Sequence, residues 1–390
     1  MQIFKKIVIT VLILFVVLIS ALYLTNTDYL LKAVRTIYLN GHTTAFLDDY
    51  QYFENHVVED GEPQPWPIHK DYNSVNETET LNVLNAQNGS IAYMILKNDS
   101  IWFENYYDGY GKDSKTNSFS MAKSMISAML GKAIMEGKIK SLDQKVGDFY
   151  PQYKDGLAGK LTVGDLSSMA SGLQWDEAYS SPFSITTRAY FDKDLEGVML
   201  DLPVVEEPGQ SYKYLSGNTE LLGMVIEKAT GKTMSQYLSD SFWKPMGAEH
   251  EALWQIDSEE GQLEKAYCCV ASNARDFARF GKLYKDYGKW NGKQLLDSAF
   301  IAKSITPRFK ESPEYGYGWW LLNHLGKHFF MMRGHLGQYV MVEPDDNIII
   351  IRLGHKSSKV DGQEDPFYAD IYTYLEEGYK MLQMSDKALK

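Results

Sequence analysis

The alternation of hydrophobic and polar residues predicts strands near both ends of the main body of the chain. Two runs rich in β-branched and aromatic residues, Ser90 to Lys97 and Ser100 to Tyr107, flank Asn98-Asp99 and predict a β-hairpin. The pattern recurs towards the C-terminus, where strands are predicted at His328 to Arg333, Gln338 to Glu343 and Asn347 to Leu353. A Glu-Pro-Asp-Asp sequence predicts the turn between the last two.

In the middle of the chain, apolar residues recur at the three- and four-residue spacing that is typical of helices. Helices are predicted at Met121 to Glu136, Asn218 to Thr230 and Ala274 to Tyr287, with a last one at Pro366 to Gln383. Strands first and last with helices between them predict an α+β fold. This fold has one antiparallel β-sheet to which both ends of the chain contribute. Helices flank the sheet, and a largely helical subdomain is attached to it.

Residues Ile7 to Leu24 are apolar except for Thr10 and Ser20, and Lys5 and Lys6 precede them. A positive flank before a hydrophobic stretch is typical of a targeting sequence, and this stretch is near the lower length limit for spanning a bilayer. No A-x-A cleavage pattern follows, so we predict an uncleaved signal anchor, a transmembrane helix with its lysines in the cytoplasm. The main alternative is a signal peptide cleaved at some position after Ser20. A buried core helix is disfavoured because no polar residues supply an opposite face.

These patterns divide the chain into three parts. Residues 1–24 form the predicted signal anchor, residues 25–75 a lead-in and connector, and residues 76–390 the main domain. The connector is predicted from the Pro-rich stretch at residues 62–67, which favours extended backbone. The anchor predicts a single-pass protein of the cell membrane with its main domain on the extracytoplasmic side. Cleavage would instead make the protein secreted or periplasmic.

The composition excludes several classes of function. The chain has 390 residues and a net charge of -12 without a Lys/Arg cluster, so nucleic acid is not an expected partner. Cys268 and Cys269 are adjacent, and neighbouring cysteines rarely reach relaxed disulfide geometry, so no disulfide framework is expected. The histidines form no recognisable zinc motif, and neither a metal nor another cofactor is predicted. The sequence does not define an oligomeric state.

Residues 120–123, Ser-Met-Ala-Lys, form an S-x-x-K pattern at the predicted start of a helix. A three-residue helical step puts the Ser120 hydroxyl and the Lys123 amine on one face. A serine hydroxyl is a poor nucleophile at neutral pH, whereas a partly desolvated lysine can lose its charge and accept the proton. A second match at residues 241–244 is followed by Pro245, which ends a helix, and we interpret it as chance.

Two further motifs follow along the chain. Residues 214–216 are Tyr-Leu-Ser, and residues 335–337 are His-Leu-Gly at the entrance to a predicted strand. With the S-x-x-K pattern, they make the sequence resemble the β-lactamase-related serine hydrolases. That family includes class C β-lactamases, D-alanyl-D-alanine carboxypeptidases, esterases and amidases, among them 6-aminohexanoate-dimer hydrolase. The resemblance covers nearly everything from about residue 80 to residue 385, including stretches at residues 161–166, 169–173, 272–276 and 317–320.

The resemblance implies a β-lactamase and penicillin-binding-protein-like fold and a role for each motif residue. Ser120 would attack a carbonyl carbon and become acylated, while Lys123 and Tyr214 would share the proton transfers. Which of the two is the general base is left open by the sequence. The oxyanion hole would consist of the backbone N–H groups of Ser120 and Gln338.

The motifs depart from those of class C β-lactamases, which carry Tyr-x-Asn and Lys-Thr-Gly. Here Ser216 replaces the amide, and His335 replaces a lysine that would pair with the carboxylate of a β-lactam. Efficient β-lactam hydrolysis is therefore not expected. Ser216, His335 and Gly337 are predicted to contact substrate, and Trp175 and residues 319–320 are candidates for an apolar acyl pocket, although core packing explains most aromatic residues equally well.

The sequence favours a serine esterase or amidase that acts on small acyl or short peptide-like substrates. A D-alanyl-D-alanine carboxypeptidase or β-lactamase, acting on peptidoglycan or β-lactams, is the alternative. A third possibility is a catalytically silent ligand-binding protein of the same fold, against which the intact set of Ser120, Lys123 and Tyr214 argues. The expected partners are a small-molecule or short-peptide substrate and, through the N-terminal helix, the membrane.

Overall fold

The main sheet is antiparallel, and both ends of the chain contribute to it. The computed structural model describes residues 1–179, 181–358 and 365–388, and within these the sheet has six strands in the order β3-β2-β12-β11-β10-β9. Their bounds are β2 Ser90–Lys97, β3 Ser100–Tyr106, β9 Trp320–His324, β10 Lys327–Gly334, β11 Gln338–Glu343 and β12 Ile348–Gly354. The predicted hairpin and C-terminal strands are thus confirmed. Asn98 and Asp99, with φ of 52° and 60°, form the left-handed turn that matches the twist of a two-residue hairpin.

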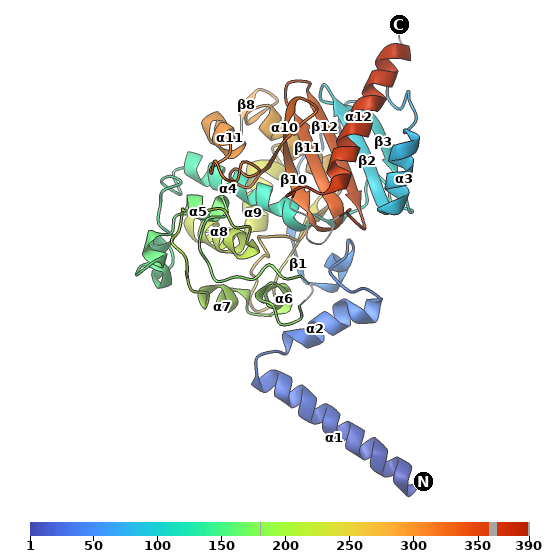
Figure 1. The fold of residues 1–390 in the computed structure, drawn as a ribbon. Helices are drawn as coiled ribbons and strands as arrows, with labels where there is room; N and C mark the ends of the chain where they lie inside the picture. The colour runs from blue at the N-terminus through green and yellow to red at the C-terminus, as the bar shows by residue number, and fades with distance from the viewer. Residues whose placement is uncertain (180, 359–364, 389–390) are drawn as a thin grey trace.

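Helices make up the middle of the chain, as predicted, and also flank the sheet (Figure 1). Their bounds are α3 Glu79–Gln87, α4 Ala122–Met135, α5 Val163–Ser167, α6 Ile185–Phe191, α7 Leu195–Leu200, α8 Ser216–Thr230, α9 Met234–Leu238, α10 Ala274–Lys285, α11 Ser298–Ser304 and α12 Ala369–Ala388. α4 is buried along most of its length and packs against α8, which joins the helical subdomain to the sheet.

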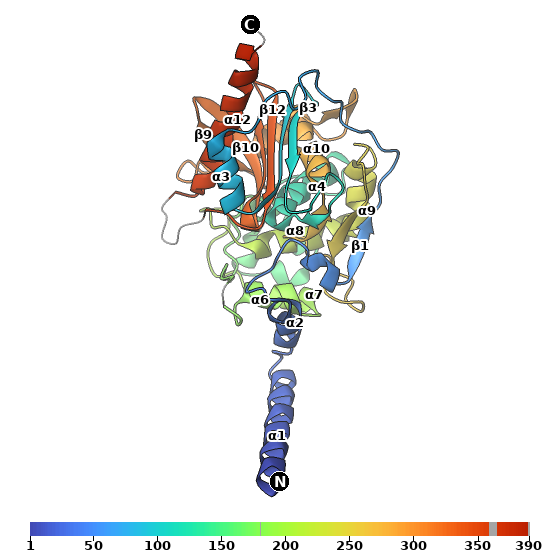
Figure 2. The ribbon, with the colours of Figure 1, turned by 90° about the vertical axis from the view of Figure 1, so that its right-hand side faces the viewer.

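Helices cover both faces of the main sheet (Figure 2). On one face, Gly281 of α10 lies against Val340 and Val342 of β11. On the other, Gly378 of α12 lies against Ile350 of β12. Alternate residues of each strand therefore enter two separate hydrophobic cores, which explains why these strands are apolar on both sides.

The structure also contains a second, smaller sheet, which the prediction of one antiparallel sheet did not include. Its strands, in the order β1-β5-β6-β4, are β1 Asn55–Val58, β5 Ala252–Gln255, β6 Val270–Ser272 and β4 Thr116–Asn117. A further short hairpin pairs β7 Lys289–Trp290 with β8 Lys293–Gln294. Strands this short carry too few residues for an alternating pattern to be recognised.

The lead-in segment packs on the domain that follows it. β1 pairs with β5, and Trp66 of the Pro-rich stretch donates from Nε1 to the Arg275 carbonyl at 2.9 Å. α2, Tyr29–Thr36, packs against α6. The boundary at residue 76 stays a prediction, but residues 25–75 supply structural elements and do not serve only as a connector.

The N-terminal helix α1, Gln2–Leu24, extends away from the body of the molecule (Figure 1). None of its residues is buried, and among the described residues it is the one helix long and apolar enough to cross a membrane. Its length, composition and position fit a signal anchor or a signal sequence.

The adjacent cysteines Cys268 and Cys269 form a disulfide bond, although their spacing made one unexpected. The chain makes a tight turn here, with a left-handed φ of 77° at Cys269, directly before β6. This turn, which neither regular strand nor regular helix provides, accommodates the pair.

Candidate active site

The short 3-10 turn η3, Phe119–Met121, holds Ser120 between β4 and α4. Ser118 donates its backbone N–H to the Val270 carbonyl at 2.8 Å, and Phe119 donates its own to Asn117 Oδ1 at 2.8 Å. Phe119 has a φ of 45°, an uncommon conformation for a residue with a side chain. Ser120 therefore follows a sharp bend that is fixed from both sides, the kind of strained position that clusters at functional sites.

Gly334, at the end of β10, lets this bend approach the main sheet. A Cβ atom at residue 334 would collide with the Ser118 carbonyl oxygen and would lie 3.1 Å from Gln338 Cβ. The start of β11 therefore lies close to the backbone that carries Ser120, as the predicted oxyanion hole requires. The role of the Ser120 and Gln338 N–H groups themselves remains a prediction.

Gly334→Ala is expected to lower the free energy of unfolding by about 1–3 kcal/mol, because the added methyl group overpacks this contact. Thermal unfolding followed by circular dichroism measures the change. Gly111→Ala is the matched control, since a Cβ there would meet nothing within 4 Å. Equal melting temperatures for the two variants would show that the bend tolerates displacement from the sheet.

The Ser120 hydroxyl and the Lys123 amine form a hydrogen bond, with Nζ 2.9 Å from Oγ. Nζ also donates to the Tyr267 carbonyl at 2.8 Å, and the side chain is buried. Burial lowers the pKa of Lys123 to about 8, although the carboxylates of Glu177 and Glu220 favour the charged form. At pH 7 roughly a tenth of the amine is therefore uncharged and able to accept a proton, far more than for an ordinary lysine.

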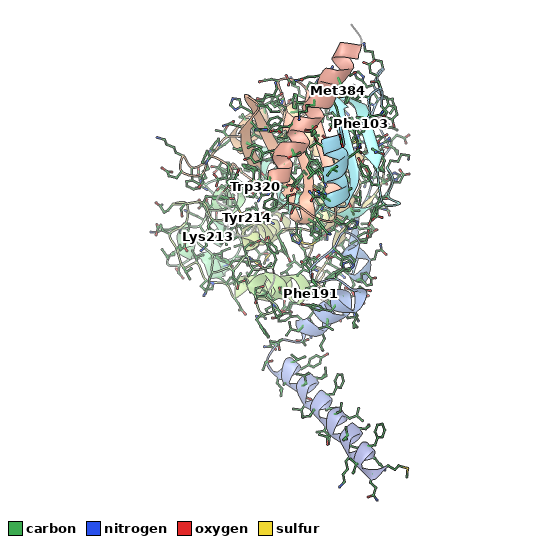
Figure 3. All side chains as sticks on the ribbon, turned by 45° about the vertical axis from the view of Figure 1, so that its right-hand side comes forward. Phe103, Phe191, Lys213, Tyr214, Trp320 and Met384 are labelled. Atoms are coloured by element: carbon green, nitrogen blue, oxygen red, sulfur yellow. A yellow bond between two sulfur atoms is a disulfide. The ribbon has the colours of Figure 1, made fainter. Side chains whose placement is uncertain are left out.

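Tyr214 belongs to the same cluster. Its hydroxyl lies near Ser120, and Lys123 Nζ lies 5.2 Å from the centroid of its ring. The ring packs on Trp320 with 5.3 Å between centroids (Figure 3). Burial, with Glu177 adding to it, raises the pKa of Tyr214 above its ordinary value. The phenol thus keeps its proton at neutral pH.

A carboxylate that the sequence did not single out lies beside the motif residues. Glu177 accepts hydrogen bonds from the Ser216 backbone N–H at 2.7 Å and from the Ser216 hydroxyl at 2.5 Å. The Tyr179 hydroxyl donates to it at 2.5 Å. Glu177 lies four residues after the stretch at residues 169–173 that shares in the family resemblance, and this proximity is the only signal for it in the sequence.

Glu177→Gln is expected to move the acid limb of the pH–rate profile to lower pH. The removed charge favours the protonated form of Lys123, so its loss lets the amine deprotonate at a lower pH. The measurement is kcat/KM for p-nitrophenyl butyrate against pH, with the exposed Glu207→Gln as a charge-matched control. If the acid limb of the profile stays in place or moves to higher pH, Glu177 does not favour the protonated form of the amine that controls the rate.

The third motif forms the turn between β10 and β11. His335 stacks on Tyr179, with centroids 5.5 Å apart and planes 14° apart, and meets the Phe119 ring edge-on. Gly337 has a φ of 84°, and a Cβ there would collide with the Arg352 guanidinium, so the fold itself requires this glycine. The predicted contact of Gly337 with substrate stays a prediction.

Ser120, Ser216 and His335 line one cavity of about 380 Å³. This volume lies within the usual range for a small-molecule site. Lys123 and Tyr214 lie beside Ser120 but are not among the described residues that line the cavity. Trp175 does not line the cavity in the described part of the chain but is buried against Gly217, so its contact with substrate remains a prediction.

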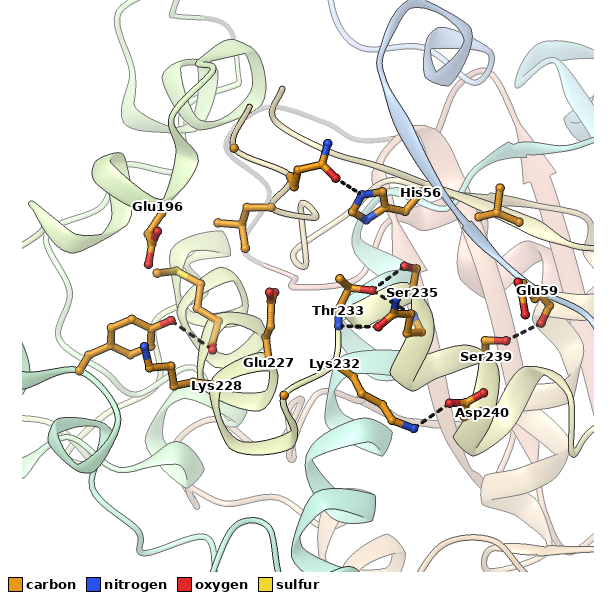
Figure 4. Close-up of a pocket in the computed structure, with 18 residues that line it drawn as sticks. His56, Glu59, Glu196, Glu227, Lys228, Lys232, Thr233, Ser235, Ser239 and Asp240 are labelled. Carbon is orange, nitrogen blue, oxygen red and sulfur yellow. Dashed lines mark hydrogen bonds and ion pairs between the residues drawn. The ribbon is translucent and has the colours of Figure 1, made fainter. Parts of the chain in front are cut away.

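A larger cavity, about 960 Å³, lies elsewhere, between β1, α8 and α9 (Figure 4). Its walls are polar and charged, with Lys232 paired to Asp240 at 2.7 Å and with burial raising the pKa of Glu227 to about 7. Ser120 does not line it. Size alone therefore does not identify the catalytic cavity, and we place the candidate site where the serine and lysine meet.

The fold, with a serine, a lysine and a tyrosine at its candidate site, is that of a β-lactamase-type hydrolase. Residues 78–373 match the Beta-lactamase family, and the chain belongs to that family.

Relatives with hydrolase names extend the match. The chain is 23% identical over 284 residues to the 6-aminohexanoate-dimer hydrolase of Paenarthrobacter ureafaciens, covering 67% of this chain and 71% of that protein. It is 23% identical over 300 residues to the "Putative D-alanyl-D-alanine carboxypeptidase" of Escherichia coli (strain K12), covering 61% and 68%. Among solved structures, the "Putative 6-aminohexanoate-dimer hydrolase from Bacillus anthracis" superposes with a TM-score of 0.69 at 19% identity, covering 92% of this chain and 95% of that one. That structural likeness supports the fold.

Proposed function

We propose that the protein is a serine hydrolase that forms an acyl-enzyme at Ser120 and acts as an esterase or amidase. The observation that carries the proposal is the 2.9 Å contact between Ser120 Oγ and a buried Lys123 amine whose pKa is lowered to about 8. A nucleophile within hydrogen-bond reach of a base that is partly neutral at working pH is the requirement for covalent catalysis.

In this mechanism, Lys123 is the general base. Its neutral amine takes the Ser120 proton as Oγ bonds to the substrate carbonyl carbon, and the negative charge moves to the carbonyl oxygen. The N–H groups of Ser120 and Gln338 would stabilise that oxygen. Tyr214 is less suited to be the base because its raised pKa favours the neutral phenol. Its hydroxyl would instead give its proton to the leaving alcohol or amine and receive from Lys123 the proton taken from Ser120, so that both groups return to their neutral forms. Water then releases the acyl group by the reverse sequence.

The charges around the site favour a neutral substrate. No Lys, Arg, Asp or Glu lines the cavity, as far as the structure describes its walls. Glu177 holds Ser216, so a carboxylate on the substrate at this point would meet a like charge. Together with His335 in place of a lysine, this argues against β-lactams.

A D-alanyl-D-alanine carboxypeptidase is the second candidate. The Escherichia coli relative carries that name, and an extracytoplasmic domain would face such peptides. The substrate again has a free carboxylate, and the position of Glu177 makes this candidate less favoured than an esterase or amidase.

One panel of substrates separates these functions. The full-length chain in detergent is assayed with p-nitrophenyl butyrate, 6-aminohexanoate dimer, a D-Ala-D-Ala peptide and nitrocefin. Turnover of the ester or the dimer supports the proposal, whereas selective release of D-alanine or rapid opening of nitrocefin would overturn the substrate preference. Failure on all four, with Ser120 inert to a fluorophosphonate, would favour a silent binding protein.

A further inference from the structure

The cavity at Ser120 extends from the nucleophile to the helix that follows the N-terminal anchor. We propose that the acyl group transferred to Ser120 carries a long apolar chain, that this chain lies in the cavity against α2, and that it comes from an amphiphile in the bilayer. The inference rests on the proposed acyl-enzyme function and extends it beyond small acyl groups.

α2 and the residues directly after it turn an apolar stripe towards the cavity. The lining residues from this segment are Leu30, Ala33, Val34, Ile37 and Tyr38. They follow the spacing i, i+3, i+4, i+7 and i+8, which places them on one face of a helical segment. The opposite face is polar: Lys32 donates to the Asp257 carbonyl at 3.1 Å, and Arg35 is exposed.

The opposite wall comes from α6 and the loop before it. Thr186, Thr187, Tyr190 and Phe191 contribute from α6, which packs against α2. At the inner end, Phe119, Tyr179 and Tyr267 surround Ser120. The cavity therefore joins the nucleophile to α2 along a continuous surface that is mostly apolar.

An apolar rim marks the open end. The Phe183 side chain is 73% exposed, that of Tyr38 57% and that of Val34 45%, and all three line the cavity. Apolar side chains gathered at the mouth of an apolar cavity are typical of a surface that contacts a hydrophobic partner. A peptide would leave backbone groups unpaired along these walls, whereas a hydrocarbon chain has none to satisfy.

The position of α2 indicates where the chain comes from. Only residues 25–28 separate the end of α1 from the start of α2 (Figure 1). With α1 in a bilayer, α2 and the rim would lie at its surface, where the acyl chain of an ester or amide amphiphile is available. In the transfer step, the bond from Ser120 Oγ to the acyl carbon forms, the bond to the leaving oxygen or nitrogen breaks, and the alcohol or amine departs with the proton.

The test measures kcat/KM of the full-length chain for monomeric p-nitrophenyl esters of increasing acyl length. Each added methylene group buried in the cavity is expected to raise kcat/KM by about three- to fourfold until the cavity is full. Ala33→Phe should lower the ratio of the decanoate to the acetate value, because the ring occupies the space beside α2. Arg35→Phe, on the outer face of the same helix, should leave that ratio unchanged.

Val34→Asp provides a second obstruction at an exposed position, so it tests the proposal even where Ala33→Phe fails to fold. It should also lower the ratio, by placing a charge at the rim. A ratio near one in the wild type, or an undiminished ratio in both cavity variants, would overturn the acyl-chain proposal. Labelling of Ser120 by a short ethyl fluorophosphonate distinguishes failure of this inference from failure of the proposed function. If Ser120 is labelled but kcat/KM does not depend on acyl length, only the acyl-chain inference is overturned. If Ser120 is not labelled, the proposed function is overturned.

The source of the chain is tested in phosphatidylcholine vesicles that contain the full-length protein. Hydrolysis of p-nitrophenyl laurate is compared when the ester is in the same vesicles and when it is added in separate vesicles. Faster hydrolysis from the shared bilayer supports a membrane source. Equal initial rates would overturn it and point to a soluble long-chain ester.

Discussion

Ser120→Ala is expected to reduce kcat for p-nitrophenyl butyrate by about 10⁴-fold or more, as loss of a catalytic nucleophile typically does. The reason is that without Oγ no covalent intermediate forms, and only binding and the oxyanion hole remain. Steady-state rates of the purified wild type and variant measure the effect, with circular dichroism to verify that both are folded.

The chain offers its own control for this experiment. Ser241 belongs to the other S-x-x-K match, in a π-helical turn, Ser239–Trp243, and Lys244 bonds Glu59 at the surface. Ser241→Ala should therefore keep wild-type turnover. Residual activity of Ser120→Ala within tenfold of wild type would place the nucleophile elsewhere.

Lys123→Met is expected to lower kcat/KM by about 10²- to 10⁴-fold, the usual contribution of a general base. Methionine keeps most of the buried volume of the side chain but cannot accept the Ser120 proton. In the wild type, kcat/KM should fall about tenfold per pH unit below a midpoint near the Lys123 pKa of about 8, because protonation removes the base. It should level off above that pH.

The variant should lose this acid limb as well as the rate. Lys244→Met, which removes a surface lysine, is the control and should retain both. A Lys123→Met enzyme with the wild-type pH profile would contradict the assignment of Lys123 and would favour Tyr214 as the base.

The main sheet was predictable because its strands are long and apolar. β2, β10 and β12 each provide enough residues for strand composition to stand out, and the Asn98-Asp99 turn is a local signal. The second sheet had neither advantage. β4 has two residues, and β1 pairs with β5 from a distant part of the chain, so its strands form through tertiary contacts that local pattern does not encode.

The candidate site likewise has one part that the sequence predicts and one part that it does not. Ser120 and Lys123 are three residues apart on one helical turn, so their contact follows from local geometry. Glu177 reaches Ser216 from a loop 39 residues away and belongs to no motif that the sequence displays. Only the folded chain brings the two together.

The sequence does not predict which aromatic residues line the cavity. Trp319 packs on Tyr284 with 4.2 Å between centroids, and Trp320 supports Tyr214, so both serve packing outside the cavity. The walls come instead from α6 and from α2, in the segment interpreted as a lead-in. Apolar spacing reveals that a helix has an apolar face, but not which cavity that face will line.

The most direct test of the central claim is the intact mass of the protein after reaction with a fluorophosphonate, followed by peptide mapping. One added phosphonyl group is expected, located on Ser120, with labelling that slows as pH falls below about 8 together with protonation of Lys123. A folded protein that stays unlabelled, or one labelled on another serine, would contradict it.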